Sequence, residues 1–191
     1  MEELACHILD IARNSIEAGA TRLSIVVAED PEEDYCLFSV ADNGSGMSGR
    51  LVRRLGDPFF TTKSGKKVGL GLPLLQDAVD LCGGRLEIYS RPGRGTRVTA
   101  VFPYHHLDRA PLGDVAGTII ALLAGNEHLD ICYHYSFAGR DMHLDTREIR
   151  ARLKGVPLGV PEVLLWLRRY LVESEEILRG GGEIEVARRA G

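Results

Sequence analysis

Residues 8–21 read Ile8-Leu9-Asp10-Ile11-Ala12-Arg13-Asn14-Ser15-Ile16-Glu17-Ala18-Gly19-Ala20-Thr21. The apolar residues recur close to a 3.6-residue period, which predicts an amphipathic helix over residues 2–18 that ends at Gly19. The polar stripe of this helix carries His7, Asp10, Asn14 and Glu17. A solvated surface face explains such a stripe, but Asn14 is a poor helix former in mid-helix, and its amide oxygen suits Mg²⁺.

A tight loop follows the next two predicted strands, which span residues 23–27 and 35–41. The loop reads Asp42-Asn43-Gly44-Ser45-Gly46-Met47. Asp42 can accept a hydrogen bond from an exocyclic amine, and the two glycines let the backbone pass close to a flat ring. Many loops at strand ends contain Asp and Gly, so this signal is weak when taken alone.

A segment rich in Gly, Thr and Lys comes next, and it is predicted to be a loop over residues 56–67 followed by a helix over residues 68–81. Backbone N–H groups at a helix N-terminus, together with lysines, can hold phosphate groups. A solvated loop is the equally weighted alternative. The spacing of the glycines matches neither the Walker A motif nor the dinucleotide-binding fingerprint.

In this order, these motifs resemble the GHKL superfamily of gyrase, heat-shock chaperone, histidine kinase and MutL ATPases. Residues 8–21 resemble the N box, and residues 42–47 resemble the first glycine box. Asp57-Pro58-Phe59-Phe60-Thr61-Thr62-Lys63 is similar to the phenylalanine box and lid of histidine kinases, and Val68-Gly69-Leu70-Gly71-Leu72 to the second glycine box. Pro92-Gly93-Arg94-Gly95-Thr96 and Phe102-Pro103 resemble the closing strand pair. The resemblance covers residues 2–103.

The resemblance implies the Bergerat ATP-binding fold, an α+β two-layer sandwich with helices on one face of a mixed sheet. It implies ATP and Mg²⁺ as ligands, with Asn14 holding the metal. It further implies that Asp42 bonds the adenine amino group with help from Thr96, while Gly44 and Gly46 line the adenine pocket. Gly69, Gly71 and Lys63 would contact the phosphates, and Lys66 and Lys67 are weaker phosphate contacts.

The chain departs from the family pattern at the residue four positions before Asn14. Hydrolysing members carry Glu there as general base, whereas this chain has Asp10, which is one methylene shorter. A catalytic role and a structural or metal-supporting role for Asp10 are equally weighted.

His7 does not match a phospho-acceptor motif, and surface or packing roles are expected for His105, His106 and His134. The resemblance therefore predicts a protein that is similar to a stand-alone kinase-like domain. Such a protein would act on a partner by phosphoryl transfer or ATP hydrolysis. The alternative is a non-enzymatic ATP sensor in which order in the lid controls partner binding.

The remaining residues, 104–191, are predicted to form a C-terminal α/β extension of unknown role, separate from the ATP-binding domain of residues 1–103. Helices are predicted from Asp114 to Ala124, over residues 146–153 and from Pro161 to Leu178, with a hairpin over residues 131–144. The last helix carries an apolar band, which either packs on the core or docks a partner: Leu164, Trp166, Leu167, Tyr170 and Leu171. The first strand lacks a preceding strand, so either this extension or a second copy would cover its edge.

Composition narrows the class of protein. Apolar residues make up 45% and the formal net charge is −4. Each half of the chain, divided at Pro103, carries a net charge of −2, which argues against nucleic acid as a partner. No apolar run approaches the roughly 20 residues of a membrane span. The four cysteines lie too far apart for a CxxC metal site, and Glu2 and Glu3 do not fit a signal peptide. These features predict a cytoplasmic protein that does not contact a membrane.

Overall fold

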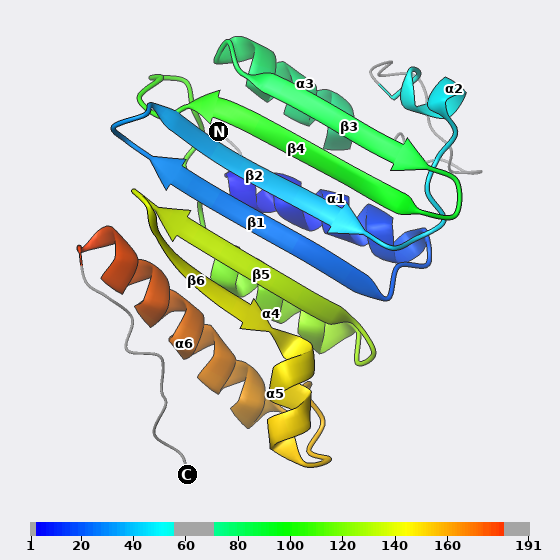
Figure 1. The fold of residues 1–191 in the computed structure, drawn as a ribbon, viewed down its shortest axis with the longest axis vertical. Helices are drawn as coiled ribbons and strands as arrows, with labels where there is room; N and C mark the ends of the chain where they lie inside the picture. Colours follow the sequence, from blue (N-terminus) through cyan, green and yellow to red (C-terminus); the bar gives the residue numbers. More distant parts are fainter. Residues whose placement is uncertain (1–2, 56–70, 182–191) are drawn as a thin grey trace.

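Six helices and six strands are defined in the computed structural model, which describes residues 3–55 and 71–181 (Figure 1). Up to Pro103 they are α1 (Leu4–Glu17), β1 (Arg22–Asp30), β2 (Tyr35–Asp42), α2 (Gly49–Val52), α3 (Gly71–Leu81), β3 (Arg85–Arg91) and β4 (Gly95–Pro103). Beyond it they are α4 (Val115–Gly125), β5 (Asp130–Phe137), β6 (Arg140–Asp145), α5 (Thr146–Leu153) and α6 (Pro161–Arg179). None of these helices is long and apolar enough to cross a lipid bilayer.

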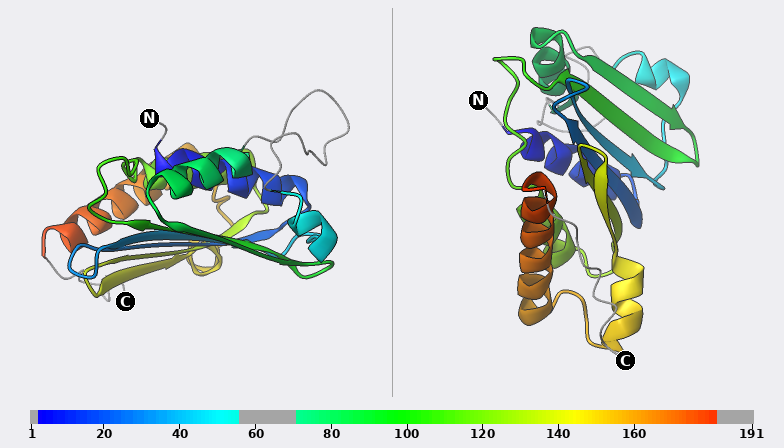
Figure 2. Two further views of the ribbon diagram at one scale, coloured as in Figure 1. Left: turned by 90° about the horizontal axis from the view of Figure 1, so that it is seen from above. Right: turned by 60° about the vertical axis from the view of Figure 1, so that its left-hand side comes forward.

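The strands form one mixed sheet in the order β3-β4-β2-β1-β5-β6. Every neighbouring pair is antiparallel except β1 and β5, which are parallel. Helices α1, α3 and α4 line one face of the sheet, and α6 continues this layer beside β5 and β6 (Figure 2). The predicted α+β arrangement, with helices on one face of a mixed sheet, is therefore confirmed.

The edge of β1 is covered by the C-terminal part of the chain. Strand β5 pairs with β1 along its length, from Arg22 opposite Asp130 to Glu29 opposite Phe137. This pairing makes β1 an inner strand, so the first of the two predicted ways to cover its edge is the correct one. No second copy is needed for that purpose.

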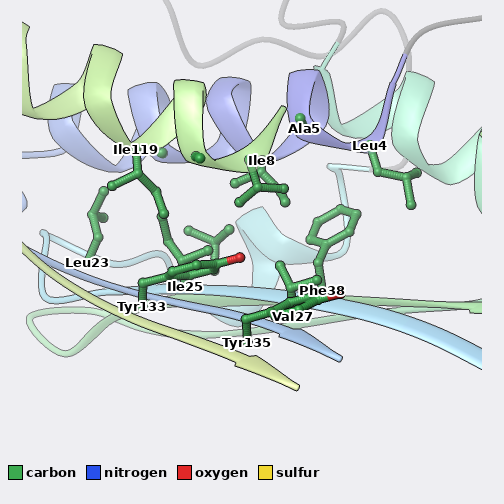
Figure 3. Close-up of a cluster of buried hydrophobic side chains, with 14 of the residues drawn as sticks. Leu4, Ala5, Ile8, Leu23, Ile25, Val27, Phe38, Ile119, Tyr133 and Tyr135 are labelled. Atoms are coloured by element: carbon green, nitrogen blue, oxygen red, sulfur yellow. The ribbon is translucent and has the colours of Figure 1, made fainter. Parts of the chain in front are cut away.

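One hydrophobic core spans both parts of the chain. Ile8 of α1 and Ile119 of α4 point toward the sheet, where Ile25 of β1 and Tyr133 of β5 lie, and all four side chains are fully buried (Figure 3). Burial of this kind contributes roughly 1.5–3 kcal/mol per large side chain. Residues 104–181 thus continue the sheet and the core of the first part of the chain. The division into an ATP-binding domain of residues 1–103 and a separate extension stays a prediction.

Helix α6 is held to the sheet by buried polar groups as well as by its leucines. Tyr133 donates its hydroxyl hydrogen to Glu175 Oε1 at 2.8 Å, and Tyr135 donates to Glu29 Oε2 at 2.9 Å. Arg179 donates to Tyr135 Oη at 2.7 Å and to Glu29 at 2.9 Å. Because burial disfavours its charged form, the pKa of Glu175 is raised. These bonds satisfy polar groups that would otherwise be costly to bury.

The apolar band predicted on the last helix divides into two sets. Leu164, Leu167 and Leu171 are buried in the core, as the packing interpretation expected. Trp166 is 55% exposed and stacks on Tyr170 with ring centroids 5.8 Å apart. The leucines therefore belong to the core and Trp166 does not.

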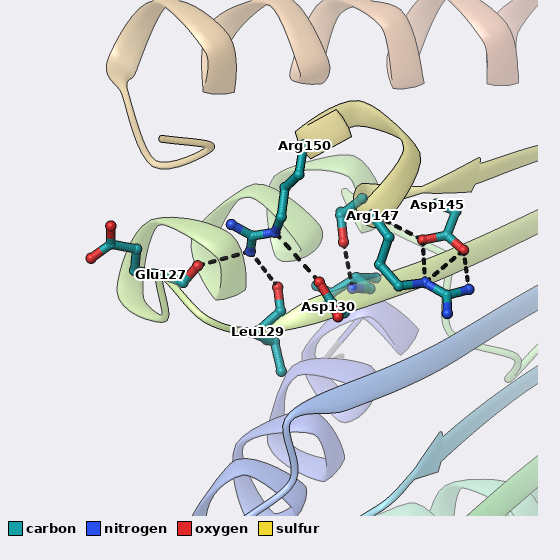
Figure 4. Close-up of polar contacts among 8 residues, drawn as sticks. Glu127, Leu129, Asp130, Asp145, Arg147 and Arg150 are labelled. Atoms are coloured by element: carbon teal, nitrogen blue, oxygen red, sulfur yellow. Dashed lines mark hydrogen bonds and ion pairs between the residues drawn. The ribbon is translucent and has the colours of Figure 1, made fainter. Parts of the chain in front are cut away.

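Two of the helix starts predicted in the extension are confirmed by capping contacts. Asp114 accepts from the Gly117 amide at 2.7 Å, and Asp145 accepts from the Arg147 amide at 2.9 Å. Arg150 then fixes α5 to the start of β5 by donating to the carbonyls of Glu127 and Leu129 (Figure 4). The predicted hairpin is formed by β5 and β6, and its turn consists of Ala138 and Gly139, which both adopt positive φ.

Candidate functional site

A pocket opens where β2 ends, between α1, the loop that follows β2, and the start of β4. Its lining residues come from four separate parts of the chain: Ile11, Asn14, Ser15, Asp42, Met47, Leu72, Thr96 and Val98. The structure thus brings three predicted site residues, Asn14, Asp42 and Thr96, into one pocket. Most of the remaining lining is apolar, which suits a flat ring with a few polar atoms.

The Asp42 carboxylate is fixed in this pocket by three hydrogen bonds. Oδ1 accepts from the Gly44 amide at 2.7 Å and from the Thr96 amide at 3.2 Å. Oδ2 accepts from Ser15 Oγ at 2.7 Å. A carboxylate offers about four acceptor positions, so one position remains for a ligand that donates a hydrogen.

Ser15 was not predicted from the sequence as a site residue. Its side chain is 5% exposed and its hydroxyl reaches Asp42 across 27 residues of sequence. Ser15 lies on the buried side of an amphipathic helix directly after Asn14, and this position alone does not distinguish a site residue from an ordinary small core residue. Its role is to orient the carboxylate.

The loop after β2 is pressed against the β3–β4 turn. Gly93 donates its amide hydrogen to the Ser45 carbonyl at 2.7 Å, and Met47 donates to Ser90 Oγ at 2.7 Å. Gly46 has φ +63°, and a Cβ at this position would lie 2.0 Å from the Arg91 carbonyl oxygen. The absence of a side chain at Gly46 is therefore required by backbone packing.

Gly95, like Gly46, has no space for a side chain because another backbone segment lies against it. It has φ +83°, and a Cβ there would lie 1.9 Å from the Asp42 carbonyl oxygen. Gly95→Ala should lower the free energy of unfolding by about 3 kcal/mol, because the turn and the Asp42 loop must move apart. Gly93→Ala is the matched control: Gly93 has φ +70°, but a Cβ there would meet no atom within 4 Å, so a loss of about 1 kcal/mol is expected. Urea titration measures both, and equal losses would contradict the prediction.

Asp10, a residue of α1, lies against the first residue of α3. The ideal Cβ position of Gly71 is 3.5 Å from Asp10 Oδ2, so the carboxylate lies against the backbone at this point. Asp10 and Asn14 are one turn apart on α1, as the sequence predicted. His7, from the same predicted polar stripe, is 5% exposed and so does not lie on a solvated face.

Several predicted phosphate contacts fall on residues 56–70. Lys63, Lys66, Lys67 and Gly69 lie outside the described residues, and so does the predicted loop over residues 56–67. Gly71 is the single predicted phosphate contact within the described part of the chain.

Comparison with known proteins extends these observations. The family model for histidine kinase-, DNA gyrase B-, and HSP90-like ATPases matches residues 3–106. The sensor protein kinase FleS of Pseudomonas aeruginosa is 38% identical over 120 residues, which cover 59% of this chain and 29% of FleS. The sensor kinase CckA of Brucella abortus is 32% identical over 130 residues, which cover 60% of this chain and 14% of CckA. The chain therefore spans less than a third of the length of these relatives.

The fold recurs in a solved structure of low sequence identity. The N-terminal domain of a DNA repair protein superposes with a TM-score of 0.52 at 15% identity, and the match covers 76% of this chain and 53% of that one. At this identity the likeness shows the fold alone. The structural match covers more of this chain than residues 3–106, the part that the family model matches.

Proposed function

Because the chain belongs to the family of histidine kinase-, DNA gyrase B-, and HSP90-like ATPases, we propose that it binds ATP with Mg²⁺ and acts on a partner protein by phosphoryl transfer or ATP hydrolysis. The observation that carries this proposal is the Asp42 carboxylate, which is fixed by Ser15, Gly44 and Thr96 with one acceptor position remaining. The exocyclic amino group of adenine is a donor of the kind that this position accepts, whereas the oxo group of guanine is not.

The residues at the other side of the pocket fit a metal-bound triphosphate. Asn14 lines the pocket and offers a neutral amide oxygen, and Mg²⁺ usually takes only one or two protein oxygens. When bound, Mg²⁺ would neutralise phosphate charge. Gly71 begins the described part of α3, and backbone amides near a helix start favour phosphate groups. Lys63 and Gly69 are proposed as further phosphate contacts.

Asp10 is proposed to orient and deprotonate the attacking water in the hydrolytic version of this function. Its position next to Gly71 supports this role, because the phosphates would lie at that helix start. In the transfer version, catalysis consists of positioning and charge neutralisation, and the acceptor belongs to another protein. Among the described residues that line the pocket there is no histidine to serve as acceptor.

Single-turnover incubation with γ-labelled ATP tests the proposal. Released phosphate that Asp10→Asn abolishes would support hydrolysis, and label transferred to a second protein added from extract would support phosphoryl transfer. Asp77→Asn is the matched control, because Asp77 is an exposed carboxylate on α3 that does not line the pocket. Bound but unreacted ATP under both conditions would overturn the enzymatic proposal and favour the sensor.

A further inference from the structure

Basic and acidic residues are unevenly distributed along the first 103 residues, although their net charge is only −2. Residues 43–103 hold ten of the 23 Lys and Arg residues but only four of the 27 Asp and Glu residues. Residues 1–42 hold ten acidic residues and two basic ones. The sum over the first 103 residues is therefore a poor description of the field that a partner would meet.

Three of these basic residues lie close together at one end of the sheet, around the β3–β4 turn. Tyr89 of β3 lies directly opposite Arg97 of β4, and the Arg91 guanidinium lies 5.2 Å from the Tyr89 ring centroid. Arg94 occupies the turn itself, where its amide donates to the Arg91 carbonyl. We call these four residues the arginine tip. All four are exposed, Tyr89 to 58%.

The arginines of the arginine tip form no ion pair within the described part of the chain. The ion pairs found in residues 3–55 and 71–181 include none with Arg91, Arg94 or Arg97. Two more exposed arginines are Arg50 in α2 and Arg53 directly after it, and α2 packs against β3. The positive charge of this end is thus available to an outside partner.

Half of the ten acidic residues of the first segment lie at the opposite end of the sheet, in and beside the β1–β2 turn (Figure 1). They include Asp30, Glu32, Glu33 and Asp34. Strand β2 joins the two ends with eight residues, or about 27 Å at about 3.4 Å per residue. The Debye length at physiological salt is about 8 Å, so the acidic end does not cancel the field of the arginine tip.

The arginine tip does not serve the nucleotide pocket. Thr96 lines the pocket, and the next residue, Arg97, points to the other face of the sheet because side chains alternate along a strand. Tyr89 lies opposite Arg97 on that same open face. Yet the turn that carries these residues contacts the pocket loop through Gly93 and Ser45. A partner held at the tip would therefore lie next to the pocket without blocking it.

We propose that the arginine tip is a docking surface for an acidic protein surface, which it holds beside the nucleotide pocket. Arginine binds carboxylates in a bidentate manner. Arginine and tyrosine are also enriched among the interface residues that contribute most of the binding energy. A nucleic acid is disfavoured because the tip offers only a few phosphate contacts, whereas the rest of the molecule is acidic. This inference rests on the proposed action on a partner and names the chemistry of that partner.

The test uses fluorescein-labelled oligoglutamate as the probe and fluorescence anisotropy as the readout. Arg94→Glu with Arg97→Glu should weaken binding at least about tenfold, because attraction becomes repulsion. Arg152→Glu with Arg169→Glu changes the net charge equally at exposed arginines of α5 and α6, so affinity should stay within about twofold. Arg94→Gln with Arg97→Gln should give an intermediate loss.

Three outcomes would overturn the docking surface. Equal weakening by the two charge reversals would mean that only net charge matters, and tighter binding of a single-stranded oligonucleotide of equal charge would favour a nucleic acid. Self-association that Arg94→Glu with Arg97→Glu abolishes would mean that a second copy occupies the tip. ATP affinity is measured on the same samples: wild-type protein that fails to bind ATP contradicts the proposed function, whereas unchanged ATP affinity with unselective oligoglutamate binding contradicts the docking surface alone.

Discussion

Asp42→Asn is expected to lower the affinity for ATP by at least about 100-fold. The carboxylate has one acceptor position left after its bonds to Ser15, Gly44 and Thr96. In asparagine one oxygen remains, which the amides of Gly44 and Thr96 already use, and the new amide group presents hydrogens toward the ligand. The adenine amino group would lose a hydrogen bond to a charged group, which contributes about 1.5–3 kcal/mol, and would face a donor in a partly buried site, where a donor without an acceptor costs a further ~1–3 kcal/mol.

This substitution separates recognition from folding. Asn has the shape of Asp, its oxygen can keep the two backbone bonds, and its amide can donate to Ser15 Oγ. The free energy of unfolding should therefore change by less than about 1 kcal/mol, while isothermal titration calorimetry shows the loss of ATP binding. Asp77→Asn is the control on an exposed carboxylate, and its ATP affinity should equal that of the wild type. Tight ATP binding by the Asp42→Asn protein would contradict the assignment of the pocket.

Local structure was predictable because its signals are local. Pro161 at the first turn of α6, Asp114 as the cap of α4 and Gly19 after α1 each fix a helix end through groups a few residues away. Short segments rich in β-branched residues likewise predicted β1 and β2. The short helix α2 lacks such a pattern and was missed.

The pairing of β5 with β1 could be foreseen only as one of two alternatives. Leu23 lies opposite Ile131, more than 100 residues later in the sequence, and nothing in either segment specifies the other. The burial of Glu29 and Glu175 was also beyond prediction, because glutamate is buried only where a partner satisfies it. Tyr133, Tyr135 and Arg179 supply those partners from distant segments.

Only some residues of the candidate pocket could be predicted from the sequence, because only some stand in a recognisable motif. Asn14, Asp42 and Thr96 were identified because each stands in a motif whose order along the chain is distinctive. Ser15 was missed because a serine facing the core has no pattern that separates it from an ordinary small residue. The arginine tip was hidden for another reason: the sum of charges over a half of the chain says nothing of where the fold places them.

Asn14→Ala is expected to reduce Mg²⁺-dependent ATP turnover at least about 100-fold. In the proposed site Asn14 supplies the protein oxygen that holds the metal on the phosphates, and a misplaced reacting group can cost about 100-fold in rate. Alanine is a better helix former than asparagine by about 0.5 kcal/mol, and Asn14 is exposed in the last turn of α1. The variant should therefore be at least as stable as the wild type, so a loss of turnover would not reflect unfolding.

The measurement compares nucleotide binding and turnover across a Mg²⁺ titration. In the Asn14→Ala protein, ATP affinity in EDTA should match that of the wild type, because Asp42 and Thr96 still hold the base, and only the gain in affinity on adding Mg²⁺ should be lost. Arg13→Ala is the control: Arg13 is an exposed neighbour on α1 that does not line the pocket, so its Mg²⁺ response should be normal. An unchanged Mg²⁺ response in Asn14→Ala would assign the metal to other residues, and Asp10 would be the first to examine because it lies one helical turn away beside Gly71.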